Sequence, residues 1–156
     1  MSFTSSRALH SLGVAKLMQF WSNELGGFDP DEMFVLGWLH DVGYAVAWGD
    51  NETRTKVGAF LLSMLGYSGA PEIESHGNAT PDDSVELQLL NLADMSINSR
   101  GDRVSFQDRR RDISERYGED SIQVRRFDDC LSTAKKYKIY QELMSKACLM
   151  ISTRFF

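Results

Sequence analysis

Four residues of metal-ligand type fall on helical faces that the sequence predicts to be buried. His10 shares the apolar face of the first predicted helix, and the pair His40 and Asp41 comes at the end of the second. Asp94 lies on the apolar stripe of a later helix, and that stripe carries no lysine or arginine. Burying an unpaired carboxylate is costly, and a carboxylate near a helix C-terminus meets an unfavourable dipole. Both aspartates therefore require a cation or a donor nearby.

Three separate helices thus direct ligand-type side chains inward, which is improbable as coincidence. Two imidazoles and two carboxylates form a mixed nitrogen and oxygen donor set. Such a set suits Mn²⁺, Fe²⁺, Co²⁺, Ni²⁺ or Zn²⁺ better than Ca²⁺, and it leaves coordination positions open for water and substrate. Because sites with open positions are usually catalytic, the pattern favours an enzyme that uses a divalent metal.

Several of these residues also have ordinary interpretations. A single histidine on an apolar face, such as His10, is more often a hydrogen-bonded core residue. His76 lies in a Ser-His-Gly-Asn turn, where the ordinary alternative is an exposed loop histidine. The three arginines at 109–111 would suit nucleic acid, but Asp108 and Asp112 flank them, so we expect a solvated helix face and no nucleic-acid partner.

The elements that must position these residues are predicted to be helices, because strand-like alternation is almost absent. Asp29, Thr80 and Ser105 are the expected N-caps, and Gly43 is expected to supply a left-handed turn after the second helix. The predicted helices cover residues 5–23, 30–42, 52–65, 71–75, 81–96 and 106–117.

The chain after Gly118 contains neither glycine nor proline, and its apolar residues recur at alternating spacings of three and four. This pattern predicts either one long amphipathic helix or two helices with a bend. No repeat, low-complexity tract or linker divides the chain. We therefore expect an all-α single domain over residues 1–156, with a bundle core at 5–118 and a C-terminal helical extension at 119–156.

Composition narrows the class of protein. The chain has 156 residues, of which 42% are hydrophobic, and its net charge is −5, so it exerts no general attraction on nucleic acid or anionic membranes. The longest uncharged stretch, residues 57–70, is too short and too polar to span a membrane. We expect a cytoplasmic protein with no membrane partner, in which Cys130 and Cys148 stay reduced because they would lie about 27 Å apart on a straight helix.

The order of the candidate ligands resembles the HD-domain superfamily of metal-dependent phosphohydrolases. The resemblance rests on His10 within HSLGVA, on His40 and Asp41 within GWLHDVG, and on Asp94 within LNLAD, and it covers about residues 5–118. The stretches GAFLL, HG and AD are also similar to small bacterial HD hydrolases, including the symmetrical diadenosine tetraphosphatase type. The resemblance implies an all-α bundle, one divalent metal held by His10, His40, Asp41 and Asp94, and a substrate with a phosphate ester or anhydride.

The chain departs from the family pattern at two positions. Members with a two-metal centre carry a further histidine four residues before a Val-Gly glycine, where this chain has Arg54, so a second metal is not expected. Members often follow the His-Asp-x-Gly run with a basic residue, where this chain has Tyr44. We expect Arg54 and Lys56 to meet the negative charge of the substrate, with Arg100 and Arg103 as weaker candidates.

The leading hypothesis is hydrolysis of a phosphomonoester or phosphoanhydride in a nucleotide. Asp41 would ligate the metal and accept a proton from water, and His76 would protonate the leaving group or anchor phosphate. One alternative is an HD module that binds a nucleotide as a sensor without turning it over. Another is a structural metal in a protein that pairs, as a homodimer for instance, through the C-terminal helix at 120–154.

Overall fold

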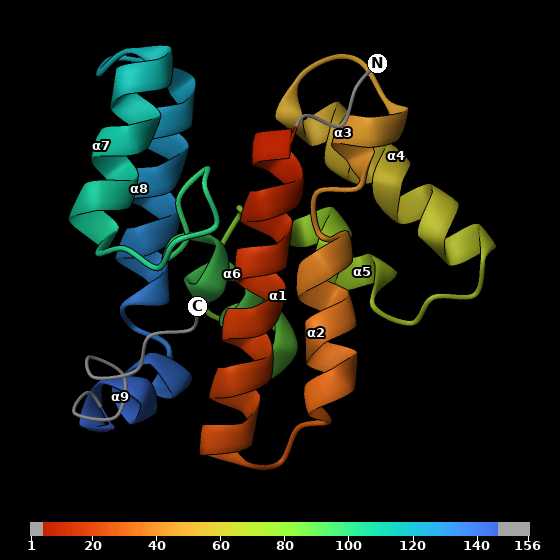
Figure 1. The fold of residues 1–156 in the computed structure, drawn as a ribbon, viewed down its shortest axis with the longest axis vertical. Helices are drawn as coiled ribbons and strands as arrows, with labels where there is room; N and C mark the ends of the chain where they lie inside the picture. Colours follow the sequence, from red (N-terminus) through yellow and green to blue (C-terminus); the bar gives the residue numbers. More distant parts are fainter. Residues whose placement is uncertain (1–4, 147–156) are drawn as a thin grey trace.

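The regular secondary structure of the protein is helical throughout the part that the computed structural model describes, residues 5–146. An isolated antiparallel bridge joins Ile97 to Arg103, and no strand occurs between residues 5 and 146. The prediction of an all-α fold is therefore confirmed. Figure 1 shows the helices α1(Ser5–Leu25), α2(Pro30–Leu39), α3(Gly43–Val46), α4(Asn51–Met64), α5(Ala70–Ser75), α6(Val85–Asp94), α7(Phe106–Tyr117), α8(Ile122–Ala134) and α9(Lys138–Ser145).

Side-chain caps determine where most of these helices begin. The carboxylate of Asp29 accepts hydrogen bonds from the backbone N–H groups of Asp31 and Glu32, and Pro30 occupies the first position of α2. The hydroxyl of Ser105 accepts the N–H of Asp108 at the start of α7. These caps satisfy N–H groups that have no partner inside the helix. The bounds of α1, α4, α5 and α7 lie within two residues of their predictions.

The prediction that the second helix runs to Val42 is wrong. α2 ends at Leu39, and residues 40–42 form a turn before the short helix α3. Gly43 does not adopt the left-handed conformation predicted for it. Instead, a Cβ at Gly43 would collide with the carbonyl oxygen of Arg54, so this glycine lets α3 pack directly on α4. That close packing takes the chain off the axis of α2.

The prediction that a helix begins at Pro81 and ends at Ser96 is also wrong, because α6 covers only Val85–Asp94. Thr80 donates hydrogen bonds from both its N–H and its hydroxyl to the Asp83 carboxylate, at 2.9 and 2.7 Å. These bonds close a turn that precedes the helix. Ser84 is the true N-cap of α6, and its hydroxyl accepts the N–H of Leu87.

The C-terminal extension follows the alternative of two helices with a bend. α8 ends at Ala134 and α9 begins at Lys138, and between them Tyr137 is buried. The Tyr137 hydroxyl donates a hydrogen bond of 2.6 Å to the Asp83 carboxylate, which ties the bend to the turn before α6. Cys148 and the rest of the predicted C-terminal helix lie outside the described residues. The expectation that the Cys148 thiol stays reduced therefore remains a prediction.

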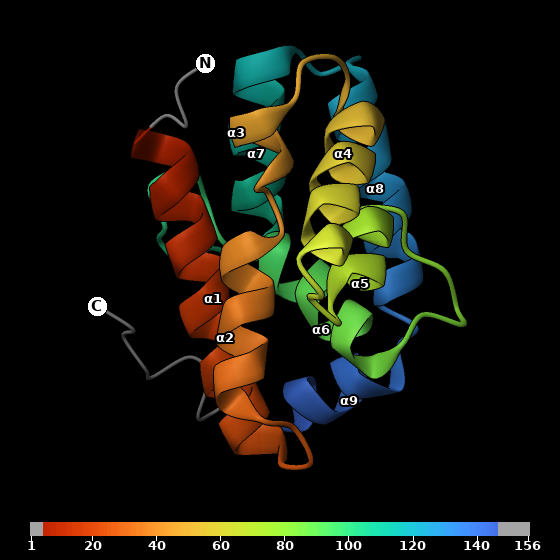
Figure 2. The same ribbon diagram turned by 90° about the vertical axis from the view of Figure 1, so that its right-hand side faces the viewer.

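The helices form layers around α6. This helix contacts α1, α2, α5, α8 and α9, while α1 packs along α2. The α7–α8 pair lies on one side of α1 and α6, and α3, α4 and α5 lie on the other (Figures 1 and 2). α1 and α2 approach closely because Gly37 faces the backbone of Ala15. Within residues 5–146 no helix combines the length and the apolar character that crossing a membrane requires.

Candidate metal centre

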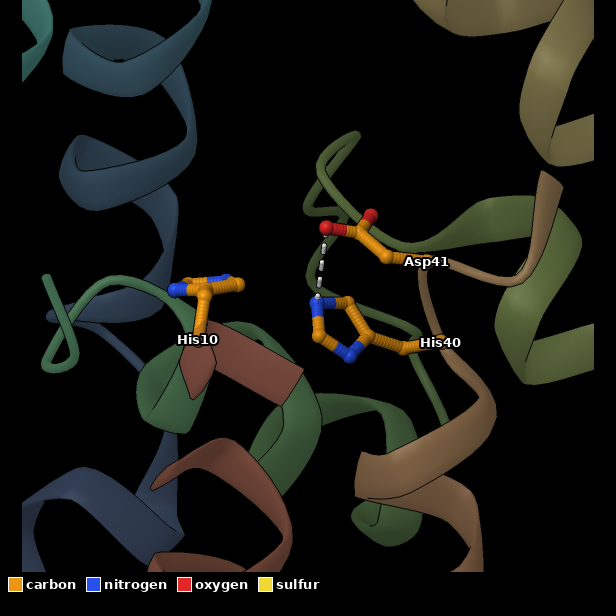
Figure 3. A group of neighbouring side chains, drawn as sticks. All are labelled: His10, His40 and Asp41. Atoms are coloured by element: carbon orange, nitrogen blue, oxygen red, sulfur yellow. Dashed lines mark ion pairs between the residues drawn. The ribbon is translucent and has the colours of Figure 1, made fainter. Parts of the chain in front are cut away.

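Three imidazoles and two carboxylates converge beside α1 and α6. His10 comes from α1, His40 and Asp41 from the end of α2, His76 from the end of α5, and Asp94 from the last position of α6. Candidate ligand atoms of His10, His40 and Asp41 lie within 4.8 Å of one another, and so do those of His40, His76 and Asp94. Figure 3 shows the first of these groups. The structure thus brings the four predicted ligands together and adds His76.

Backbone carbonyls orient all three imidazole rings in the same way. A carbonyl oxygen can only accept a hydrogen bond, so the ring nitrogen Nδ1 of each histidine is the donor. In a neutral imidazole, Nε2 then carries a lone pair, and in each case it is Nε2 that faces the carboxylates. Nδ1 of His10 donates to the carbonyl oxygen of Asn98 at 3.2 Å, that of His40 to Gly37 at 2.7 Å, and that of His76 to Ile73 at 2.6 Å.

Asp41 lies between two imidazoles and a guanidinium. Its Oδ2 accepts a hydrogen bond from Nη1 of Arg7 at 2.7 Å and lies 3.5 Å from Nε2 of His40. Its Oδ1 lies 3.5 Å from Nε2 of His76. Because the side chain of Asp41 is buried, these positive or polar partners are what allow the carboxylate to remain charged there.

Asp94 completes the cluster from the side of α6. Its Oδ1 lies 2.8 Å from Nε2 of His10 and 3.6 Å from Nε2 of His40. The Asp94 side chain is 26% exposed, whereas the three histidines are buried. Asp94 therefore lies where the cluster opens towards solvent.

The cluster fits a divalent metal ion. Nε2 of His40 is buried and has no hydrogen-bond partner among residues 5–146, although it lies between the carboxylates of Asp41 and Asp94. A buried polar atom without a partner is rare in folded proteins, and a cation would satisfy this nitrogen and both carboxylates together. The nitrogen and oxygen donors of the cluster are those expected for Mn²⁺, Fe²⁺, Co²⁺, Ni²⁺ or Zn²⁺.

The charges of the cluster are strongly coupled. Burial would raise the pKa of Asp41 and of Asp94, but neighbouring histidines, and Arg7 beside Asp41, hold both pKa values well below the usual range. Burial lowers the pKa of His10 despite its hydrogen bond to Asp94. For His40, the two carboxylates outweigh the effect of burial and raise the pKa to about 9. The carboxylates are thus ionised at neutral pH, as metal ligands must be, whereas a metal ion that binds Nε2 of His40 would displace a proton from that nitrogen.

His76 is not the exposed loop histidine that the sequence allowed as an alternative. Its side chain is buried, because it follows the buried Ile73 by three positions at the end of α5. The next residue, Gly77, has a φ of +83° and donates its N–H to Oδ1 of Asn91 in α6. The spacing of three residues between Ile73 and His76 is the sequence signal that could have predicted the burial of His76. Asn91 supports the turn after His76, and the sequence did not indicate that role.

Arg54 and Lys56, the cations predicted to meet substrate charge, lie away from the cluster. The guanidinium of Arg54 stacks over the Tyr44 ring at 4.5 Å from its centroid, and Lys56 pairs with Glu52 at 2.6 Å on the surface. The hydroxyl of Tyr44 donates to Asn51. The weaker candidates, Arg100 and Arg103, pair with Asp102 and stack on Trp21, respectively. The catalytic roles assigned to Arg54 and Lys56 stay predictions.

A cavity adjoins the cluster at Asp41, His76 and Asp94. One wall comes from α1, the start of α4, the turn after α5, and α6. The opposite wall comes from α7 and α8. The arginines that line this cavity are Arg7, Arg109, Arg116 and Arg126, and neither Arg54 nor Lys56 is among its lining residues.

Comparison with known proteins identifies one family. Residues 7–98, more than half of the chain, match the HD domain. No curated protein and no solved structure matches the chain. The match includes the five residues of the cluster and ends before α7, so the helices that form the second wall of the cavity lie outside it.

Proposed function

The chain belongs to the HD-domain family, and on that premise we propose that it is a divalent-metal-dependent phosphohydrolase whose substrate is a phosphomonoester or phosphoanhydride of a nucleotide. The observation that carries the proposal is the convergence of three imidazoles on two ionised carboxylates: Nε2 of His10 faces Asp94, that of His76 faces Asp41, and that of His40 lies between the two. HD domains are typically metal-dependent phosphohydrolases, and a cavity beside the cluster offers room for a substrate.

His10, His40, Asp41 and Asp94 would hold the ion. When bound, it supplies a Lewis acid for a phosphoryl oxygen and a water of lowered pKa. The backbone carbonyls of Gly37 and Asn98 keep Nε2 of His40 and His10 available, since they occupy the other ring nitrogen of each histidine.

Asp41 and His76 are placed to move protons. Asp41 borders the cavity, and an oxygen of its carboxylate would accept a proton from the attacking water. Nδ1 of His76 is engaged by Ile73, so this imidazole takes up and releases a proton only at Nε2, which lies 3.5 Å from Oδ1 of Asp41. His76 would protonate the oxygen of the leaving group.

Arg7 would orient Asp41, the residue that accepts the proton of the attacking water. Its guanidinium donates to Asp41 at 2.7 Å and stacks on the Tyr44 ring at 3.7 Å, so the side chain is held from two directions. Arg7 also lines the cavity. A guanidinium in this position can bind a phosphoryl oxygen while it keeps Asp41 charged.

Metal content of the untagged protein, purified without chelator, tests the proposal. We expect about one transition-metal ion per chain in the wild type and in the control Asp129→Ala, which removes an exposed carboxylate of α8. Asp94→Ala should lose the ion. The loaded protein should then hydrolyse at least one member of a panel of nucleotides and phosphate esters. Absence of metal after incubation with Mn²⁺, Fe²⁺ or Ni²⁺ would overturn the proposal, and metal without turnover would favour the nucleotide sensor.

A further inference from the structure

The wall of the cavity that α7 and α8 contribute is cationic. Three arginines from these helices line it, namely Arg109, Arg116 and Arg126, and no acidic residue of α7 or α8 is among the lining residues. The facing wall carries Asp41 and Asp94 of the cluster, together with Arg7 and Glu52. In a chain of net charge −5, three arginines on one side of a single cavity are a local reversal of charge.

Arg109 and Arg116 share one carboxylate. Nη1 of Arg109 lies 2.7 Å from Oδ2 of Asp112, and Nη2 of Arg116 lies 3.3 Å from the same oxygen. Arg109 is buried, so the solvated face predicted for residues 109–111 is wrong at this position. One negative charge therefore balances two positive ones, and this part of the wall keeps a net positive charge.

The remaining positive charge of the α7–α8 wall comes from Arg126. It is partly buried on α8, and it makes no hydrogen bond and no ion pair with any residue between 5 and 146. Two nearby arginines that do not line the cavity do have partners. Arg110 pairs with Asp128 and Glu119, and Arg125 donates to the backbone carbonyl of Asp120. Among the described arginines of α7 and α8, Arg126 is thus the one that lines the cavity with neither a hydrogen bond nor an ion pair of its own.

We propose that the α7–α8 wall binds a second phosphate of the substrate, so that the substrate is a phosphoanhydride and Arg126 determines this specificity. The inference rests on the proposed function, which places the first phosphate at the metal cluster. A phosphomonoester has one anionic group and would leave Arg126 unpaired across the cavity. A phosphoanhydride places anionic groups on both walls, and guanidinium groups bind phosphate oxygens through paired hydrogen bonds.

The reaction that follows is hydrolysis of the anhydride. The water oxygen forms a bond to the phosphorus held at the cluster, and the bridging P–O bond breaks with its electron pair on the departing phosphate. The two protons of the water end on the two phosphate products or in solvent. Arg126 and its neighbours would hold the departing phosphate, where negative charge develops as the bond breaks.

Calorimetric titration of the metal-loaded protein with inorganic phosphate and with pyrophosphate tests the inference. The wild type should bind pyrophosphate more tightly than phosphate. Arg126→Gln removes the charge but keeps a polar side chain, and it should weaken pyrophosphate binding about tenfold to hundredfold, as expected for loss of a hydrogen bond to a charged group, with phosphate binding unchanged. The matched control Arg125→Gln removes the same charge from the next residue and should leave both affinities unchanged.

The outcomes separate this inference from the proposed function. If phosphate binds and pyrophosphate binds no more tightly, or if Arg126→Gln weakens both ligands equally, the wall is not a second phosphate site and the inference is overturned alone. If the metal-loaded protein binds neither ligand, both the inference and the proposed function fail. Circular dichroism of Arg126→Gln establishes that the variant is folded before its affinities are compared.

Discussion

The side chain of Asn91 ties the central helix α6 to the turn that follows His76. Its Oδ1 accepts the N–H of Gly77 at 2.9 Å, and its Nδ2 lies 3.4 Å from Oδ2 of Asp83 and from the hydroxyl of Tyr137. Asn91 is 1% exposed, so these partners replace water entirely. A hydrogen-bond network therefore runs from Tyr137 in the bend before α9, through Asp83 and Asn91, to the backbone of Gly77 beside His76.

Replacing Asn91 with alanine should weaken both the fold and the cluster. Asn91→Ala leaves the N–H of Gly77 without its partner, and an unsatisfied buried group costs about 1–3 kcal/mol. We expect the free energy of unfolding in urea to fall by about that amount and hydrolytic turnover to fall with it. The control Asn23→Ala, at an exposed position of α1, should change neither. Equal effects in the two variants would show that the network does not support His76.

Replacing Gly37 with alanine should separate α1 from α2. Replacement of glycine by alanine inside a helix is normally stabilising. At Gly37, however, a Cβ would lie 2.7 Å from Cα of Ala15, and backbone atoms cannot move aside as side chains do. We predict a loss of about 1–3 kcal/mol in the free energy of unfolding, typical of overpacking, together with weaker metal retention because His10 and His40 flank this contact. Unchanged or increased stability would show that the helices can separate without cost.

Replacing His76 with alanine distinguishes a proton donor from a metal ligand at this position. As the proton donor at Nε2, His76 can be removed without loss of the ion, so His76→Ala should keep its metal and lose about 100-fold or more in turnover. Asp94→Ala, measured in parallel, should lose the metal as well. If His76→Ala loses the ion to the same extent as Asp94→Ala, His76 is a ligand and the proton must come from another group.

The thiol of Cys130 should resist alkylation. Burial raises its pKa to about 12, so very little thiolate is present at neutral pH. We expect the labelling rate of Cys130 by iodoacetamide in the folded protein to keep rising through pH 10, without the plateau that an ordinary thiol reaches above about pH 9. Peptide mass spectrometry distinguishes Cys130 from Cys148. A plateau near pH 9 at Cys130 would show that this side chain is open to solvent.

Helix starts could be predicted from the sequence wherever the cap is local. Asp29 and Ser105 satisfy backbone N–H groups two or three residues ahead, so the sequence itself contains both partners. The same logic fails at Thr80, where Asp83 bonds back to Thr80 and is also held by Tyr137, 54 positions further along the chain. The turn that Asp83 closes is thus also held by a contact that the local sequence does not reveal, whereas Ser84, the N-cap of α6, is again a local cap.

From the sequence alone we could predict the all-α class and the inward direction of His10, His40, Asp41 and Asp94, because both follow from helical periodicity and from the cost of burying charge. Only the tertiary structure decided that His76 joins these residues and that the cationic wall comes from α7 and α8 rather than from Arg54 and Lys56. The physical reason is the same in both cases. Helical periodicity indicates which face of a helix is buried, but the packing of distant helices decides which side chains meet there.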